Sequence, residues 1–454
     1  MNPPRSDALV FFGSTGDLAF KQIFPALEAL VRHGRLDLPI IAVGRKDLDV
    51  DELRARAKES ISKSGSFDAA AFAKLAALIR YVKVDYDDAA TFSAIKDALG
   101  PAKHPLHYVA LPPEVFEQVA TNLAKAGLNE GARLSLEKPF GSDGASARAL
   151  SASLHRYFPE EAIFRIDHYI GKESVENLIY FRAANPLIEA SFRRDYVQSI
   201  EITMAESFGV KGRARFYDAV GAVRDVVQNH LLEVIACIAM EIPADRGHRG
   251  LRAERSRLLG QIRALSAADI VRGQARGYDN EEGVAKGSTT ETFAALRLFI
   301  DSPRWQGVPI FIRTGKSLPV TATEAILRWK QPEHPVLEEQ LAQKPNYVRF
   351  RIGPDNAIAI GANVKKDGRA MVGERKELIL RRTGPEETKP YERLIGDALD
   401  GDPTMFAERV AVEESWRVVD PVLGHTQVFP YEPGLWGPPE ASRIQPEGGW
   451  SNPQ

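Results

Sequence analysis

The chain has 454 residues, more than one hydrophobic core usually organises, so its length predicts two domains. Its 59 basic and 61 acidic residues leave a formal net charge of -2, which argues against a global field that attracts nucleic acid or an anionic membrane. No apolar run approaches the roughly 18 residues that span a bilayer. The single cysteine, Cys237, lies in an apolar stretch and favours a reducing compartment. We therefore expect a cytoplasmic protein without nucleic-acid or membrane partners.

Short apolar runs alternate with alanine-rich helical stretches in the first third of the chain. The runs lie at 8–12, 39–44, 81–84, 106–111 and 133–139. Strands and helices in this rhythm predict an α/β domain with a doubly wound, Rossmann-type parallel sheet. We assign residues 1–165 to this dinucleotide-binding domain.

From residue 166 onward, alternating apolar runs follow one another with turns between them. They are "VQSIEITMAE", "FAALRLFID", "VPIFIRTG", "TEAILRWK", "YVRFRIG", "AIAIGANV" and "KELILRRT". This pattern predicts a large antiparallel sheet, with helices around 221–240 and 403–415. Residues 166–454 are thus expected to form an α+β domain, in which the Pro/Gly-rich tail from residue 430 is loosely ordered.

A glycine turn follows the first apolar run. Gly13 and Gly16 precede a helix that begins near Asp17 and Leu18, where backbone N–H groups and the helix dipole can hold a pyrophosphate. The middle glycine of the usual G-x-G-x-x-G pattern is missing, so a simple tight turn is an equally good interpretation of this motif alone.

Basic residues follow the second strand of the same region. An acidic residue at this point favours the ribose 2'-hydroxyl of NAD, whereas a basic one favours the 2'-phosphate of NADP. This chain has Arg45 and Lys46 there. Solvated basic residues after a strand are common, but together with the glycine turn they favour NADP.

The densest polar cluster lies where the domains are expected to meet. Asp167, His168, Tyr169 and Lys172 fall within six residues, directly before a helical pattern. Imidazole, phenol and ammonium donors beside a helix N-terminus suit a phosphate group. The competing interpretation is a surface loop that only caps the helix.

A second cluster begins a strongly apolar helix. Asp225 and His230 lie in "RDVVQNHLLE", but five residues turn a helix by about 500°, so spacing alone does not bring these two side chains together. A lone histidine in such a helix is more often a hydrogen-bonded core residue than a catalyst.

Eight motifs follow one another along the chain. They are "GxxGDLA" at 13–19, "EKPFG" at 137–141, "DHYIGKE" at 167–173, "RDVVQNHLLE" at 224–233, "TETFAAL" at 290–296, "VPIFIRTGK" at 308–316, "YERLIGDALDGDPTMF" at 391–406 and "DPVL" at 420–423. Together and in this order they resemble the glucose-6-phosphate dehydrogenase family. The resemblance spans nearly the whole chain. It implies oxidation of the C1 hydroxyl of glucose 6-phosphate to 6-phosphoglucono-1,5-lactone, the first step of the oxidative pentose phosphate pathway, with hydride transfer to NADP and no metal.

The resemblance also implies roles for individual residues. His230 corresponds to the general base, and Asp167 to the carboxylate that orients it. The positions that match substrate contacts are Lys138, His168, Tyr169, Lys172, Glu206, Asp225 and Lys316. Those that match cofactor contacts are Gly13, Gly16, Asp17, Leu18, Arg45, Lys46, Tyr108 and, where substrate meets cofactor, Lys138. Association into a homodimer or homotetramer through the large sheet is expected as well.

Two positions depart from the family pattern. Gln22 stands where a lysine is common, and Thr321 stands where a lysine or arginine usually helps to bind the substrate. Both changes remove a positive charge, so the substrate could also be a related sugar phosphate. The sequence leaves open two further functions as well, a different sugar oxidoreductase and a homologue that binds nucleotide without catalysis.

Overall fold

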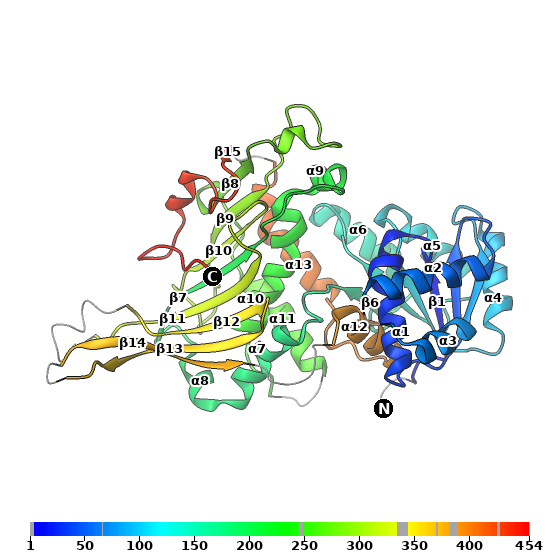
Figure 1. Ribbon diagram of the computed structural model, residues 1–454, viewed down its shortest axis with the longest axis horizontal. Coiled ribbons are helices and arrows are strands. Elements are labelled where there is room, and N and C mark those ends of the chain that lie inside the picture. Colours follow the sequence, from blue (N-terminus) through cyan, green and yellow to red (C-terminus); the bar gives the residue numbers. More distant parts are fainter. Residues whose placement is uncertain are drawn as a thin grey trace. The chain divides into compact units, whose positions relative to one another are not determined.

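The computed structural model describes residues 4–65, 67–244, 248–333, 344–368, 371–381, 388–424 and 427–453. The chain divides into two compact units. Unit 1 comprises Met1–Glu173, Pro243–Ala253 and Glu387–Glu413, and unit 2 comprises Ser174–Ile242, Glu254–Glu386 and Glu414–Gln454. Unit 1 therefore takes in two segments from well beyond residue 165, among them the helix α12 (Pro390–Asp400), which is drawn in orange in Figure 1.

Unit 1 is built on a six-stranded sheet in the order β3-β2-β1-β4-β5-β6, and all its pairs are parallel. This is the strand order of a dinucleotide-binding fold, so the predicted Rossmann-type sheet is confirmed. The strands are β1 (Ala8–Phe12), β2 (Ile40–Gly44), β3 (Ile79–Lys83), β4 (Pro105–Val109), β5 (Arg133–Glu137) and β6 (Ile163–Ile166).

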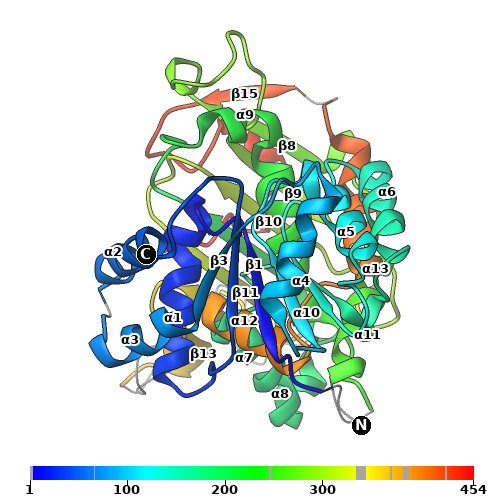
Figure 2. The same ribbon diagram turned by 90° about the vertical axis from the view of Figure 1, so that its right-hand side faces the viewer.

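Hydrophobic side chains cover both faces of this sheet, because successive residues of a strand point to opposite faces. Leu9 and Phe11 belong to a core shared with α1, α2, α3 and α12, whereas Val10 and Phe12 belong to a second core shared with α4, α5 and α6. Figure 2 shows α1 to α3 on one side of the strands and α4 to α6 on the other. The helices are α1 (Phe24–Arg32), α2 (Val50–Lys63), α3 (Ala69–Leu78), α4 (Ser93–Leu99), α5 (Phe116–Lys125) and α6 (Gly144–His155).

Unit 2 contains a nine-stranded sheet in the order β14-β13-β12-β11-β7-β10-β9-β8-β15. Six neighbouring pairs are antiparallel, as predicted, whereas β7 with β10 and β8 with β15 are parallel. The strands are β7 (Val197–Ala205), β8 (Ile270–Ala275), β9 (Phe293–Leu298), β10 (Ile310–Gly315), β11 (Ala322–Trp329), β12 (Tyr347–Gly353), β13 (Ala357–Lys365), β14 (Gly373–Arg381) and β15 (Val428–Tyr431).

The described residues include two helices of the π type, η1 (Ala19–Ile23) and η5 (Val223–Leu231). The remaining α-helices are α7 (Glu173–Ala184), α8 (Pro186–Ser191), α9 (Ala214–Ala222), α10 (Leu232–Ala239), α11 (His248–Gln261) and α13 (Arg409–Val419). Residues 223–239 are thus helical, as the sequence predicts. Within the part of the chain that the structure describes, no helix has the length and apolar character needed to cross a membrane.

Candidate active site

The glycine turn after β1 has the geometry of a phosphate cradle. Gly13 has φ +75°, and a Cβ built there would lie 2.2 Å from the backbone oxygen of Ala110. Only glycine fits this position. Gly16 donates its N–H to the Gly13 carbonyl oxygen at 2.9 Å, and the π-helix η1 begins three residues later. The turn and the helix start that follows it therefore fit the pyrophosphate of a dinucleotide.

An exposed arginine stands at the end of β2. The Arg45 guanidinium lies 5.7 Å from the centroid of the Tyr86 ring, and both Arg45 and Lys46 are exposed. Tyr86 itself is buried and interacts with the backbone of Gly13. The aromatic ring thus links the predicted 2'-phosphate residue to the glycine turn.

Strand β5 ends in a buried carboxylate that sequence reasoning missed. Glu137 accepts a hydrogen bond from the hydroxyl of Tyr108, and the hydroxyl of Tyr391 lies 3.5 Å from its other oxygen. Burial raises the pKa of Glu137 to about 7, although the two tyrosines and the neighbouring Lys138 ammonium counteract this effect. Tyr108 is only 1% exposed, and its hydroxyl is occupied by this bond.

The polar cluster predicted after β6 is a short turn between β6 and α7. The carboxylate of Asp167, 3% exposed, accepts a hydrogen bond from the backbone N–H of Tyr169 at 2.9 Å. The Lys172 ammonium lies 3.9 Å from the centroid of the Tyr169 ring. The His168 ring is stacked on Tyr391 from α12, with an interplanar angle of 13°. The structure therefore brings all four predicted residues into one turn of unit 1.

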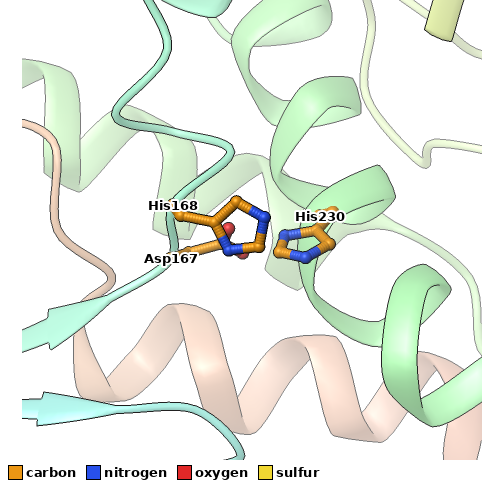
Figure 3. Close-up of side chains that lie close together, drawn as sticks. All are labelled: Asp167, His168 and His230. Atoms are coloured by element: carbon orange, nitrogen blue, oxygen red, sulfur yellow. The ribbon is translucent and has the colours of Figure 1, made fainter. Parts of the chain in front are cut away.

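In unit 2, His230 lies in the last turn of the π-helix η5 and is 4% exposed. Asn229 supports it locally, because its side chain accepts from the His230 N–H at 2.6 Å and donates to the Arg224 carbonyl oxygen at 3.0 Å. Figure 3 shows His230 on this helix, and Asp167 and His168 on the turn that follows β6. Helices of the π type are rare and occur frequently at functional sites.

The remaining predicted residues of unit 2 stand in charged pairs. Glu206 and Lys316 directly follow the parallel neighbours β7 and β10, whose last residues are in register, so the two side chains meet in an ion pair. Asp225, in the first turn of η5, is paired with Arg213 at 2.7 Å. Sequence reasoning missed Arg213, whose partner lies twelve residues along the chain.

Comparison with known proteins decides the family. Residues 10–177 match the description "Glucose-6-phosphate dehydrogenase, NAD binding domain", and residues 179–451 match "Glucose-6-phosphate dehydrogenase, C-terminal domain". The chain belongs to the glucose-6-phosphate dehydrogenase family. It is 40% identical over 451 residues to glucose-6-phosphate 1-dehydrogenase 1 of Mycobacterium tuberculosis, covering 99% of this chain and 97% of the relative.

Two solved glucose-6-phosphate dehydrogenases share the fold. The enzyme from Mycobacterium avium has a TM-score of 0.93 and 42% identity, with 99% of each chain covered. A glucose-6-phosphate dehydrogenase in complex with its substrate glucose 6-phosphate has a TM-score of 0.92 and 30% identity, with 100% of each chain covered. The chain is accordingly an oxidoreductase that uses a nicotinamide dinucleotide, and the predicted resemblance is confirmed.

The two departures from the family pattern lie in different units. Gln22 is an exposed residue of the π-helix η1. Thr321 accepts a hydrogen bond from the backbone N–H of Ser207 at 3.0 Å, and its hydroxyl lies 2.8 Å from that of Ser207. In this glucose-6-phosphate dehydrogenase family member, the threonine thus anchors the residue next to Glu206, a role that a lysine or arginine would not fill in the same way.

Proposed function

We propose that the chain oxidises the C1 hydroxyl of D-glucose 6-phosphate to 6-phosphoglucono-1,5-lactone, with hydride transfer to NADP. Family membership supports the reaction class. The observation that carries the assignment of residues is the buried imidazole of His230. It lies in the last turn of a π-helix whose first turn contains Asp225. An imidazole is suited to accept the hydroxyl proton because its ordinary pKa lies near neutral pH.

In this proposal His230 removes the C1 hydroxyl proton while the hydride leaves. Asp167 orients the imidazole and stabilises the imidazolium that forms, as the partner carboxylate does in a catalytic dyad. The bound nicotinamide supplies the hydride acceptor. His168, Tyr169 and Lys172 bind the phosphate as hydrogen-bond donors and a cation.

The other residues divide between the sugar and the cofactor. Glu206, Asp225 and Lys316 are assigned to the sugar hydroxyls, and Lys138 to the junction of substrate and cofactor. The turn at Gly13, Gly16, Asp17 and Leu18 is assigned to the pyrophosphate, and Tyr108 is assigned to the cofactor as well. NADP rather than NAD is favoured because the exposed Arg45, with Lys46 beside it, can pair with a 2'-phosphate.

We also propose that the chain forms a homodimer or homotetramer in the cytoplasm. The support for self-association is the edge strand β14, where Leu378 and Leu380 are 68% and 58% exposed. Val364 on the adjacent β13 is 40% exposed as well. Exposed apolar edges of this kind are usually covered by a partner. Replacing both leucines with lysine should lower the mass measured by light scattering toward that of one chain.

Substitution of the proposed base tests the mechanism. His230→Asn should lower kcat by about 10²- to 10⁴-fold while the KM for glucose 6-phosphate changes little, because only the proton acceptor is lost. Asp167→Asn should also lower kcat, since the amide favours the wrong imidazole tautomer. The control is His104→Asn, which makes the same change at a histidine that has no assigned role in the site. Parental turnover of His230→Asn would reject the assignment of the base.

A further inference from the structure

The motif "TETFAAL" places a buried carboxylate against the helix that carries His230. Glu291, 3% exposed, accepts a hydrogen bond from the backbone N–H of Val223 at 3.0 Å, and its own carbonyl oxygen accepts from the N–H of Ala222 at 3.0 Å. Val223 is the first residue of η5. The N–H groups of a first helical turn have no partner within the helix, so Glu291 satisfies one of them from outside.

The backbone before this helix is shaped around the same carboxylate. Gly221 has φ +69°, a conformation that favours glycine, and a Cβ built there would lie 2.6 Å from the Glu291 carboxylate oxygen. On the other side, Arg272 of β8 forms an ion pair with Glu291 and donates from its Nε at 3.1 Å. The carboxylate is therefore held between a cation and a close backbone turn, with little room to move.

The next residue of the motif fixes a second predicted substrate residue. The carbonyl oxygen of Thr292 accepts the N–H of Lys316 at 2.8 Å, and the Tyr431 hydroxyl donates to the Lys316 carbonyl oxygen at 2.7 Å. The Thr292 hydroxyl lies 2.9 Å from the Tyr431 hydroxyl. Glu291 thus contacts the backbone at the start of the helix that carries His230, and the adjacent Thr292 contacts the backbone of Lys316.

We infer that Glu291 is a positioning residue for the oxidation, because its carboxylate fixes the first turn of the helix that carries Asp225 and His230. This inference rests on the proposed role of His230. A π-helix forms i→i−5 bonds in place of the i→i−4 bonds of an α-helix, and the N–H groups of its first turn need acceptors from outside the helix. A shift of about 1 Å in a reacting group is enough to cost roughly 100-fold in rate.

Two pairs of substitutions separate positioning from mere stability. In Glu291→Gln with Arg272→Gln, the amide oxygen still accepts from Val223 and no charge is left unpaired. The second pair, Glu291→Met with Arg272→Met, has side chains of similar volume to the glutamine pair and is also neutral. It has no acceptor for the Val223 N–H. The kcat and the KM for both substrates are measured well below the melting temperature of each variant, so that only folded enzyme is compared.

We expect the glutamine pair to stay within about threefold of the parental kcat, and the methionine pair to lose about 10- to 100-fold in kcat. The KM for glucose 6-phosphate should rise in the methionine pair, and the KM for NADP should not. A residue that only stabilises the fold would lower the melting temperature and leave these constants unchanged. Parental constants in the methionine pair, or equal losses in both pairs, would overturn the inference.

A further variant keeps the test decisive if the methionine pair does not fold. Gly221→Ala places a methyl group against the Glu291 carboxylate and should produce the same loss of kcat as the methionine pair. A folded Gly221→Ala enzyme with the parental kcat would contradict the inference. His230→Asn is assayed in parallel, because its failure to lose activity would reject the proposed base whatever the Glu291 variants show.

Discussion

The Arg213 guanidinium lies 2.7 Å from a carboxylate oxygen of Asp225, and it also lies 5.6 Å from the centroid of the Phe216 ring and 5.8 Å from that of Tyr217. The ion pair fixes the orientation of a carboxylate that we assign to the sugar hydroxyls. Asp225 is largely buried, whereas Arg213 is 45% exposed. Because the pair borders solvent, its effect on substrate binding should exceed its effect on stability.

Replacing Arg213 with methionine should therefore raise the KM for glucose 6-phosphate by about 3- to 10-fold, since Asp225 loses the partner that orients it. The melting temperature should change by only a degree or two. Steady-state kinetics and thermal unfolding measure the two quantities. Arg215→Met, two residues along the same exposed segment, is the control. An unchanged KM in Arg213→Met would show that the pair does not act on the sugar site.

Cofactor choice is predicted to depend on Arg45. Arg45→Ala should weaken NADP binding by roughly 10- to 150-fold, which corresponds to the loss of a charge-assisted hydrogen bond, and should leave NAD binding almost unchanged. Titration with each dinucleotide measures the two dissociation constants. Lys46 can replace part of the lost charge, so the double variant with Arg45→Ala and Lys46→Ala should lose more of the selectivity for NADP over NAD.

Lys74→Ala serves as the matched control for this prediction, because it removes an exposed cation from α3 of the same unit. Equal losses of NADP and NAD affinity in Arg45→Ala would contradict a role at the 2'-phosphate.

The effect of the missing cation is tested at Thr321. If the substrate is glucose 6-phosphate, Thr321→Lys should lower its KM by about 10-fold or less, since the new charge is gained while the hydrogen bonds to Ser207 are lost. Thr321→Ser, which keeps the hydroxyl and adds no charge, is the control. Both variants and the parent are assayed with glucose, glucose 6-phosphate, mannose 6-phosphate and galactose 6-phosphate. A parent that prefers free glucose would reject the phosphate assignment, and one that prefers another hexose phosphate would change the substrate.

Local patterns were sufficient to predict the parallel sheet and most strands of unit 2. Continuous apolar runs indicate strands buried on both faces, and alternating apolar and polar residues indicate strands buried on one face. They did not reveal the edge pair β8 and β15, where Gly273 and Pro430 interrupt the strand signal. The tail was expected to be loosely ordered, which is wrong for its described part. The guanidinium of the buried Arg313 lies 4.1 Å from the centroid of the Trp436 ring and 4.6 Å from that of Trp450. Composition does not encode such a long-range contact.

The candidate site shows the same limit. The motifs identified the residues of the turn at 167–172 and of the helix at 223–231, because each cluster is contiguous in sequence. Tyr391 and Glu291 escaped notice although both lie in quoted motifs, since Tyr391 meets Glu137 and His168 from more than 200 residues away. Only the fold brings such supporting groups to the residues that they hold.

The buried carboxyl of Glu137 leads to a prediction about pH. Burial raises its pKa to about 7 from an ordinary value of 4.5. Between these two pH values the folded protein keeps a proton that the unfolded chain releases, so the free energy of unfolding falls as the pH rises through this window and is level above it. The contribution lost is at most on the order of 3 kcal/mol.

Glu137→Gln removes the titrating group, and its amide oxygen can still accept from the Tyr108 hydroxyl. The melting temperature of this variant relative to the parent should therefore increase by a few degrees between pH 5 and pH 8, because only the parent carries the growing cost of a buried charge. Thermal unfolding at several pH values measures this difference. Glu117→Gln, an exposed position on α5, should show a constant difference across the same range. If Glu137→Gln also keeps a constant difference, Glu137 ionises at an ordinary pKa in the folded protein, and the buried pair with Tyr108 is not the source of any pH dependence.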